Sequence, residues 1–192
     1  MACGKHFPGH GDTTVDSHLD LPRIDHDLAR LRAVELAPFA AVAPPIIMTA
    51  HVVFAALDAD VPATLSARVL RDLLRGELGY RGVIVSDDLE MKAVADRWGV
   101  VESAERALVA GCDAFLVCQD EALQRQTHAA LVRAAERSQA VRARVEESFA
   151  RVAALKAAHR FRPPATAEEI AATLGRPEHL ALAETFAATR GA

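Results

Sequence analysis

Three short apolar runs, separated by longer stretches with helical periodicity, constrain the fold of this chain more than any other feature. The runs are residues 46–51 (IIMTAH), 83–87 (VIVSD) and 114–118 (AFLVC). Continuous apolar runs of this length are typical of strands that are buried on both faces. Strands that alternate with helices predict a parallel α/β sheet, and residues 2–4 predict the stump of one more strand.

The stretches between the runs have the spacing of amphipathic helices. We predict helices over residues 27–42, 65–78 and about 101–110, two more within 120–158, and an Ala-rich helical tail over 166–190. The helix over 65–78 has one apolar face and ends at Gly79. That face consists of Leu65, Val69, Leu70, Leu73, Leu74 and Leu78. In the last helix before Pro163-Pro164, a helical spacing relates Val141, Val145, Phe149, Val152 and Leu155.

The composition is that of a globular protein. The 192 residues are 51% hydrophobic and 25% charged, with a net charge of -4, which is enough for one core-forming domain. This mild acidity predicts no binding to nucleic acid or to anionic membranes. Apolar runs stay well short of the roughly 20 residues that span a bilayer, and residues 1–4 do not resemble a signal peptide. We expect a cytoplasmic protein whose scattered Cys3, Cys112 and Cys118 are buried thiols in a reducing compartment.

Polar residues follow the predicted strands at their carboxyl ends. His51 ends the first run, Asp87 ends the second, and a loop over residues 5–18 follows the stump. Enzymes with parallel sheets place their chemistry at these ends. The chain has no glycine-rich phosphate loop, which argues against a dinucleotide-dependent dehydrogenase or a kinase.

The acidic pair Asp87-Asp88 lies between a predicted strand and a predicted helix. For Asp88 we favour a structural interpretation, in which the side chain caps the first turn of the helix. Asp87 comes one residue earlier and is expected to project into a cleft. There its carboxylate can act as a nucleophile or as an electrostatic stabiliser.

The loop over residues 5–18 concentrates titratable side chains without any periodicity. It contains three of the eight histidines together with two aspartates. Asp16 and His18 are two residues apart, so a bent loop can bring the carboxylate to the imidazole and make His18 a usable proton donor. A metal site is the competing interpretation, although the spacing matches no common zinc pattern. Its ligands would be His6, His10, Asp12 and His18.

These motifs resemble those of the family 3 glycoside hydrolases, and most closely their β-N-acetylhexosaminidase branch. The resemblance rests on KHFPGHGDT at residues 5–13, DSH at 16–18, MTAH at 48–51, PATLS at 62–66 and VSDDLEM at 85–91. It extends from residue 2 to about residue 158. Residues 160–192 resemble nothing that we recognise.

The resemblance implies a TIM barrel and a retaining hydrolysis of terminal β-linked N-acetylglucosamine, with substrates derived from peptidoglycan muropeptides. It implies that Asp87 is the nucleophile, His18 the general acid/base and Asp16 the partner of His18. An imidazole would thus replace one of the two carboxylates of the usual scheme, and a neutral ring does not repel Asp87.

The same resemblance implies a substrate-binding group consisting of Lys5, His6 and His10. It implies no cofactor and no metal, so that a chelator leaves activity unchanged.

Eight strands close the barrel of this family, whereas the sequence predicts three complete strands and a stump. We therefore expect residues 1–160 to be the C-terminal half of a barrel domain, with roughly its last four β/α units, and residues 161–192 to be a helical tail. The chain is then a fragment of a longer protein, or it associates with a second copy through open barrel edges. The alternatives are another exo-glycosidase of the family, such as a β-glucosidase, and a non-catalytic remnant that binds sugar or a partner.

Overall fold

A computed structural model describes residues 1–13, 15–159 and 163–189. Contacts between residues divide the chain into two units, residues 1–159 and residues 160–192. Each unit is described by itself.

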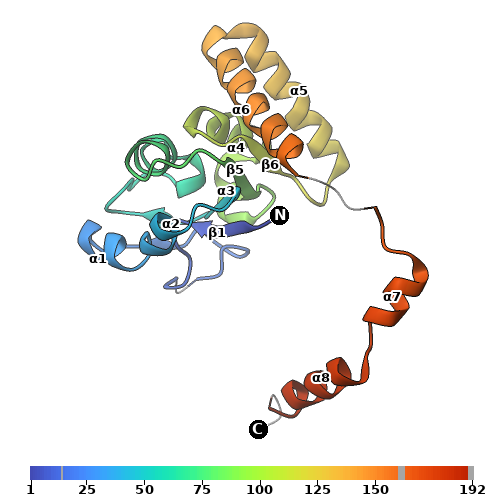
Figure 1. The fold of residues 1–192 in the computed structure, drawn as a ribbon. Coiled ribbons are helices and arrows are strands. Elements are labelled where there is room, and N and C mark those ends of the chain that lie inside the picture. The colour runs from blue at the N-terminus through green and yellow to red at the C-terminus, as the bar shows by residue number, and fades with distance from the viewer. Residues whose placement is uncertain (14, 160–162, 190–192) are drawn as a thin grey trace. The chain divides into compact units, whose positions relative to one another are not determined.

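The first unit is built on a sheet of four parallel strands (Figure 1). The strands lie in the order β1 (Cys3–Phe7), β3 (Ile46–Thr49), β5 (Val83–Asp88) and β6 (Ala114–Leu116). Ile46 pairs with Cys3 on one side and with Val83 on the other, which fixes the register of the three longer strands. The parallel α/β fold predicted from the sequence is confirmed, and among the described strands β1 and β6 form the edges of this sheet.

One prediction about the strands was wrong, and one pair of strands was not predicted. The expected stump is a strand of five residues, so Lys5 and His6 lie in β1 rather than in a loop. A second, two-stranded parallel sheet joins β2 (Arg23–Ile24) to β4 (Val53–Phe54). Strands of two residues are too short to show periodicity, so no pattern in the sequence predicts them.

The first two predicted helices are interrupted. The stretch 27–42 forms α1 (Leu28–Ala33), which Asp27 caps, and α2 (Ala37–Ala41), which has a proline in its first turn. The stretch 65–78 forms the short 3₁₀ helix η1 (Ala63–Leu65) and the helix η2 (Arg68–Glu77). At the end of η2 the turns are wide, with the N–H of Leu78 donating to the carbonyl of Leu73 at 2.9 Å.

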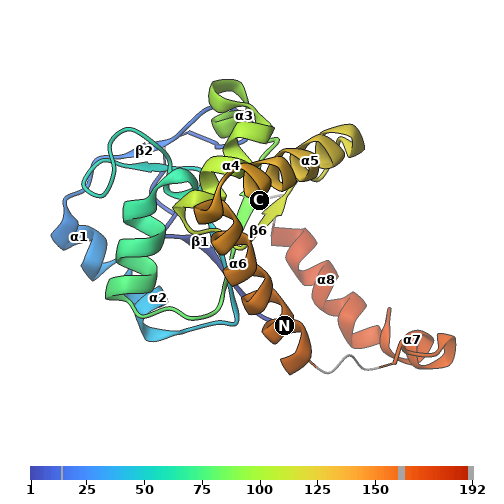
Figure 2. The same cartoon turned by 90° about the horizontal axis from the view of Figure 1, so that it is seen from above.

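The later helices follow the predictions more closely. After β5 come α3 (Lys92–Trp98) and α4 (Val100–Ala110), and after β6 come α5 (Glu121–Arg137) and α6 (Gln139–Ala158). In Figure 2, α1 and α2 lie at one end of the unit and α5 at the other. The second unit has α7 (Ala167–Thr173) and α8 (Pro177–Thr189) instead of one continuous helix. Gly175 separates them with a φ of +64°, a left-handed conformation that favours glycine.

The core surrounds the two central strands. Ile47 of β3 and Ile84 of β5 are fully buried. Leu70 and Leu74, on the apolar face of η2, are less than 2% exposed. Burial of each such side chain contributes about 1.5–3 kcal/mol. The core therefore fixes the strands, and with them the positions of the residues at the strand ends.

Arginine side chains surround a buried aspartate near the amino ends of β5 and β6. The side chain of Asp113 is completely buried, and its Oδ2 accepts from the backbone N–H of Ile84 at 2.9 Å and from Arg75 at 2.6 Å. Its Oδ1 accepts from Arg151 at 3.0 Å and from the Ser148 hydroxyl at 3.1 Å. These bonds tie η2 and α6 to the sheet.

The three thiols are free, but only Cys112 is buried. Cys3 and Cys118 are exposed, which corrects the expectation that all three are buried. Cys118 comes after the last residue of β6, where the chain has left the sheet. Within the described residues, every helix is too short or too polar to cross a membrane.

Candidate active site

Two side chains from non-adjacent strands meet at the carboxyl end of the sheet. His6 lies on β1 and Asp87 on β5, and β3 runs between these strands. Because neighbouring strands are about 4.8 Å apart, β1 and β5 are separated by roughly 10 Å. The two side chains nevertheless approach each other, with His6 Nε2 at 3.3 Å from Asp87 Oδ2. They therefore form one site above the end of β3.

The Asp87 carboxylate is oriented but not covered. Its Oδ1 accepts the backbone N–H of Asp88 at 2.8 Å. The side chain keeps 19% of its surface exposed. Oδ2 thus has His6 beside it, and the side chain as a whole remains partly exposed.

The His6 imidazole is a neutral group at neutral pH. Burial lowers its pKa, the Asp87 carboxylate acts in the opposite direction, and Lys5 and His10 add to the lowering. A neutral imidazole can still donate a hydrogen bond from Nε2 to Asp87. His6 can therefore bind a hydroxyl group or orient the carboxylate without adding charge.

His10 connects this pair to the following loop. Its ring lies edge-on to that of His6, with 5.6 Å between the centroids. Its Nε2 is 3.0 Å from the hydroxyl of Ser17, and its Nδ1 is 3.2 Å from that of Thr13. The loop is thereby folded back toward β1 and stays near Asp87.

Lys5 is exposed and lies at the rim of a cavity of about 530 Å³. The cavity is also lined by His6, His10, Asp12 and Glu35. Its wall therefore has both positively and negatively charged side chains. Gly9 allows the loop to pass close to the segment between α1 and α2, because a Cβ there would lie 3.0 Å from that of Glu35. The cavity joins three of the predicted site residues.

Asp16 and His18 do not form the contact that the sequence predicts. The Asp16 carboxylate accepts the backbone N–H of His18 at 2.9 Å, and both residues are exposed. The His18 ring has no hydrogen bond to any described residue. The loop is nonetheless at the same end of the sheet as Asp87, because the carbonyl of Ser17 accepts from the N–H of Ala93 at the start of α3.

The four residues of the metal alternative do not converge. Asp12 is hydrogen-bonded to His26, and His10 is bonded to two hydroxyls. Over residues 1–13, 15–159 and 163–189, no group of three or more His, Cys, Asp or Glu side chains is arranged to hold a metal ion. The structure therefore gives the metal interpretation no support.

The Asp88 side chain does not cap a helix as predicted. Helix α3 begins after Met91, and no side chain accepts the N–H groups of its first turn. Asp88 Oδ1 instead accepts the N–H of Glu90 in the preceding turn, at 3.2 Å. The Glu90 carboxylate accepts the N–H groups of Gln119 and Asp120, which joins the exits of β5 and β6.

His51 belongs to the site, although the sequence assigned it no role beyond its place after a strand. Its side chain is almost fully buried, and its ring reaches the Asp88 carbonyl at 3.0 Å. The signal available in the sequence was its position at the end of a predicted strand, which it shares with Asp87.

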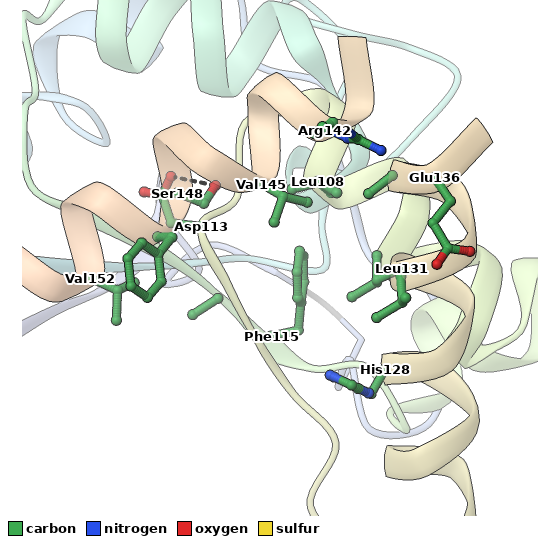
Figure 3. Close-up of a pocket in the computed structure, with 14 residues that line it drawn as sticks. Leu108, Asp113, Phe115, His128, Leu131, Glu136, Arg142, Val145, Ser148 and Val152 are labelled. Carbon is green, nitrogen blue, oxygen red and sulfur yellow. Dashed lines mark hydrogen bonds between the residues drawn. The ribbon is translucent and has the colours of Figure 1, made fainter. Parts of the chain in front are cut away.

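A separate, largely apolar groove lies between α5 and α6 over β6 (Figure 3). Its volume is about 510 Å³, and Phe115, Leu131, Val145 and Val152 line it. Phe149 lies at its mouth with 73% of its surface exposed. The groove shares no residue with the cavity beside β1.

Comparison with known proteins gives consistent matches. Residues 1–155 match the glycosyl hydrolase family 3 N-terminal domain. A beta-hexosaminidase of Alkalilimnicola ehrlichii is 47% identical over 120 residues, which are 61% of this chain and 34% of that protein. Beta-hexosaminidase A of Pseudoalteromonas piscicida is 38% identical over 199 aligned positions, covering 91% of this chain and 33% of that protein.

A solved structure gives the same result. The family 3 beta-N-acetylglucosaminidase of Paenibacillus sp. str. FPU-7 superimposes with a TM-score of 0.82 at 41% sequence identity. The match covers 92% of this chain and 34% of that one. The chain thus spans about a third of the length of the curated relatives it matches.

Proposed function

This chain belongs to glycosyl hydrolase family 3, and from that premise we propose that it takes part in the hydrolysis of terminal β-linked N-acetylglucosamine. The observation that carries the proposal is the meeting of His6 and Asp87, 3.3 Å apart, at the carboxyl ends of parallel strands. The choice of sugar rests on the relatives named beta-hexosaminidase. We propose muropeptides derived from peptidoglycan as the natural substrates.

The proposed reaction retains the configuration of the sugar. Asp87 Oδ2 attacks the anomeric carbon, the bond to the leaving oxygen breaks, and His18 gives that oxygen its proton. His18 then takes a proton from water, which attacks the glycosyl-enzyme ester and releases both the sugar and Asp87. The N–H of Asp88 supports this role, because it orients the carboxylate through Oδ1 and not through the attacking Oδ2.

His18 must move for this chemistry, since its exposed ring is not bonded to Asp16. We propose that the loop closes over bound sugar. The Asp16 carboxylate then releases the backbone N–H of His18 and accepts a hydrogen bond from the His18 ring instead. Loops that close over substrate in this way are common in enzymes. Lys5, His6 and His10 would bind the sugar hydroxyls from the cavity wall.

For the fold we propose the last four β/α units of a TIM barrel over residues 1–160 and a helical tail over 161–192. Four parallel strands in a single sheet and the family membership support this arrangement. The unpaired backbone groups of an edge strand can pair with a strand of another chain. We therefore propose self-association through β1 and through β6 with its apolar groove.

The test is release of a chromophore from an aryl N-acetyl-β-glucosaminide, together with mass spectrometry of protein trapped with a slow fluorinated substrate. We expect turnover and one sugar adduct on Asp87. The Asp87→Asn variant should form no adduct, whereas Asp96→Asn, an exposed aspartate on α3, should form it normally.

An adduct on another residue would contradict the role of Asp87. Preference for an aryl β-glucoside would favour another exo-glycosidase of the family, and sugar binding without turnover would favour a binding module. Loss of activity with a chelator would revive the metal interpretation. The cytoplasm is the proposed compartment, and cell fractionation tests it.

A further inference from the structure

His51 is a buried imidazole that the proposed chemistry does not use. It lies two residues beyond β3, and its surface is only 1% exposed. Both ring nitrogens are within hydrogen-bond distance of a partner, with Nδ1 at 2.8 Å from the Thr64 hydroxyl and Nε2 at 3.0 Å from the Asp88 carbonyl. A buried polar side chain bonded at both ends is held in one orientation.

The partners of His51 determine which nitrogen carries the proton. A carbonyl oxygen only accepts, so the Asp88 carbonyl requires a proton on Nε2. Burial lowers the pKa of His51, and the ring is therefore neutral. Nδ1 then has no proton and can only accept from the Thr64 hydroxyl, 2.8 Å away. That hydroxyl has a single proton, for which the Ala50 carbonyl at 3.0 Å is a second acceptor, and the Thr49 hydroxyl lies 2.8 Å from the same oxygen. The tautomer is therefore set at the Asp88 end of this chain of bonds.

The far end of this chain is one bond from the proposed nucleophile. His51 and the N–H of Met91 both donate to the Asp88 carbonyl, at 3.0 and 3.1 Å. The N–H of the same Asp88 donates to Asp87 Oδ1 at 2.8 Å. The carbonyl of Asp88 is thus held by His51, and the N–H of the same residue holds the Asp87 carboxylate.

We propose that His51 is a positioning residue for Asp87, acting as the neutral Nε2–H tautomer that fixes Asp88 and, through the Asp88 N–H, the orientation of the carboxylate. The Asp88 carbonyl sets this tautomer, because it can only accept a hydrogen bond. The inference rests on the proposed function in that it assigns His51 to the same reaction. Its geometric content does not depend on turnover.

The first experiment needs no substrate. Long-range ¹H–¹⁵N NMR spectra of the whole chain should show His51 as the neutral Nε2–H tautomer at pH 7. A ring protonated at Nδ1, or at both nitrogens, would overturn the proposal.

The second experiment uses His6 as a sensor of Asp87. The charged or titratable groups that act on His6 are Asp87, Lys5, His10 and His51. Asp87→Asn should lower the NMR titration midpoint of His6, because the anion that raises its pKa is gone. His51→Leu should also lower the His6 midpoint. A neutral His51 contributes no charge of its own, but without it the Asp87 carboxylate is no longer held in its orientation beside His6.

His51→Gln should restore the His6 midpoint, because its amide can still donate to the Asp88 carbonyl. The matched control is His179→Leu on α8, an exposed histidine of the second unit. An unchanged His6 midpoint in folded His51→Leu would overturn the proposal. If that variant does not fold, the tautomer of His51 in the parent protein decides, because a ring without a proton on Nε2 cannot donate to the Asp88 carbonyl.

Kinetics separate positioning from a merely structural role. Misplacing a reacting group by about 1 Å costs on the order of 10²-fold in rate. We expect His51→Leu to lower kcat by roughly 10- to 100-fold with KM nearly unchanged, and His51→Gln to recover most of it. A shift of the His6 midpoint without turnover in any variant would keep the positioning role and reject the hydrolysis.

Discussion

Two aspartates near the same pair of strands, Asp87 at the carboxyl end and Asp113 at the amino end, have opposite surroundings. Asp113 is completely buried and accepts from a backbone N–H, a serine hydroxyl and two arginines, and Arg144 lies 3.6 Å away. Asp87 keeps 19% of its surface exposed, with one backbone N–H and one histidine beside it.

The difference separates a structural carboxylate from one that can react. Removing one member of a buried ionic cluster leaves uncompensated charge and is strongly destabilising. A carboxylate with an accessible oxygen is less important for folding and remains able to bind or attack a ligand. The two aspartates therefore predict opposite results from the same substitution.

The largest effect is expected for Asp87→Asn. If Asp87 is the nucleophile, turnover should fall by about 10⁴-fold, equivalent to about 5 kcal/mol of barrier, while the urea midpoint changes little. Chromophore release and urea unfolding monitored by circular dichroism measure the two. If the variant kept turnover within tenfold of the parent protein, Asp87 would not be the nucleophile. The contrast between Asp87 and Asp113 would then no longer hold.

For Asp113→Asn the expected loss is in stability. The charges of Arg75, Arg144 and Arg151 lose their common anion, so the free energy of unfolding should drop by about 3 kcal/mol. Turnover per folded molecule should stay the same. A variant as stable as the parent protein would show that the arginines find other partners and that the cluster is not a structural requirement.

A smaller effect tests the role of His18. Proton donation matters for a poor leaving group and hardly for a good one, so His18→Ala should slow a poor substrate about 10²-fold more than an activated aryl glycoside. Rates on a series of leaving groups provide the measurement. Equal losses across the series would contradict the acid role.

The smallest effect is expected from pH. Burial lowers the pKa of His51 and of His6 in the folded state, whereas the unfolded rings have a pKa of about 6.5. Above that value both states are neutral. Below it the unfolded state takes up more protons, so stability should decrease as pH falls from about 7 to about 5.

Urea midpoints across this range measure the pH effect. The decrease should be weaker in His51→Leu than in the parent protein, because one of the two histidines is removed. An equally steep decrease in both proteins would show that His51 is not responsible.

The sequence predicted the central strands of the sheet better than its edge at β1, and it did not predict the contacts between the site residues. Residues 46–51 and 83–87 were predicted as strands because central strands such as β3 and β5 are continuously apolar. Residues 114–118 have the same apolar pattern, although β6 is an edge strand whose residues are only partly buried. Lys5 and His6 were assigned to a loop because β1 is an edge strand with a mixed pattern of burial. The proximity of His6 to Asp87 depends on strand order, which a local pattern does not contain.

The backbone contacts were also beyond local patterns. Asp16 binds the N–H of His18 rather than its ring, and His51 reaches the carbonyl of Asp88, 37 residues away. Three arginines gather around Asp113 from η2 and α6. Charged side chains such as these give no periodic signal, since only the packing of the elements brings them together.

β1 is an edge of the described sheet, and it carries Lys5 and His6. A strand from a second copy that paired with β1 would bring its own side chains within reach of the same sugar, in trans. Specific activity would then depend on protein concentration: it would fall on dilution, and two different inactive variants would restore each other when mixed.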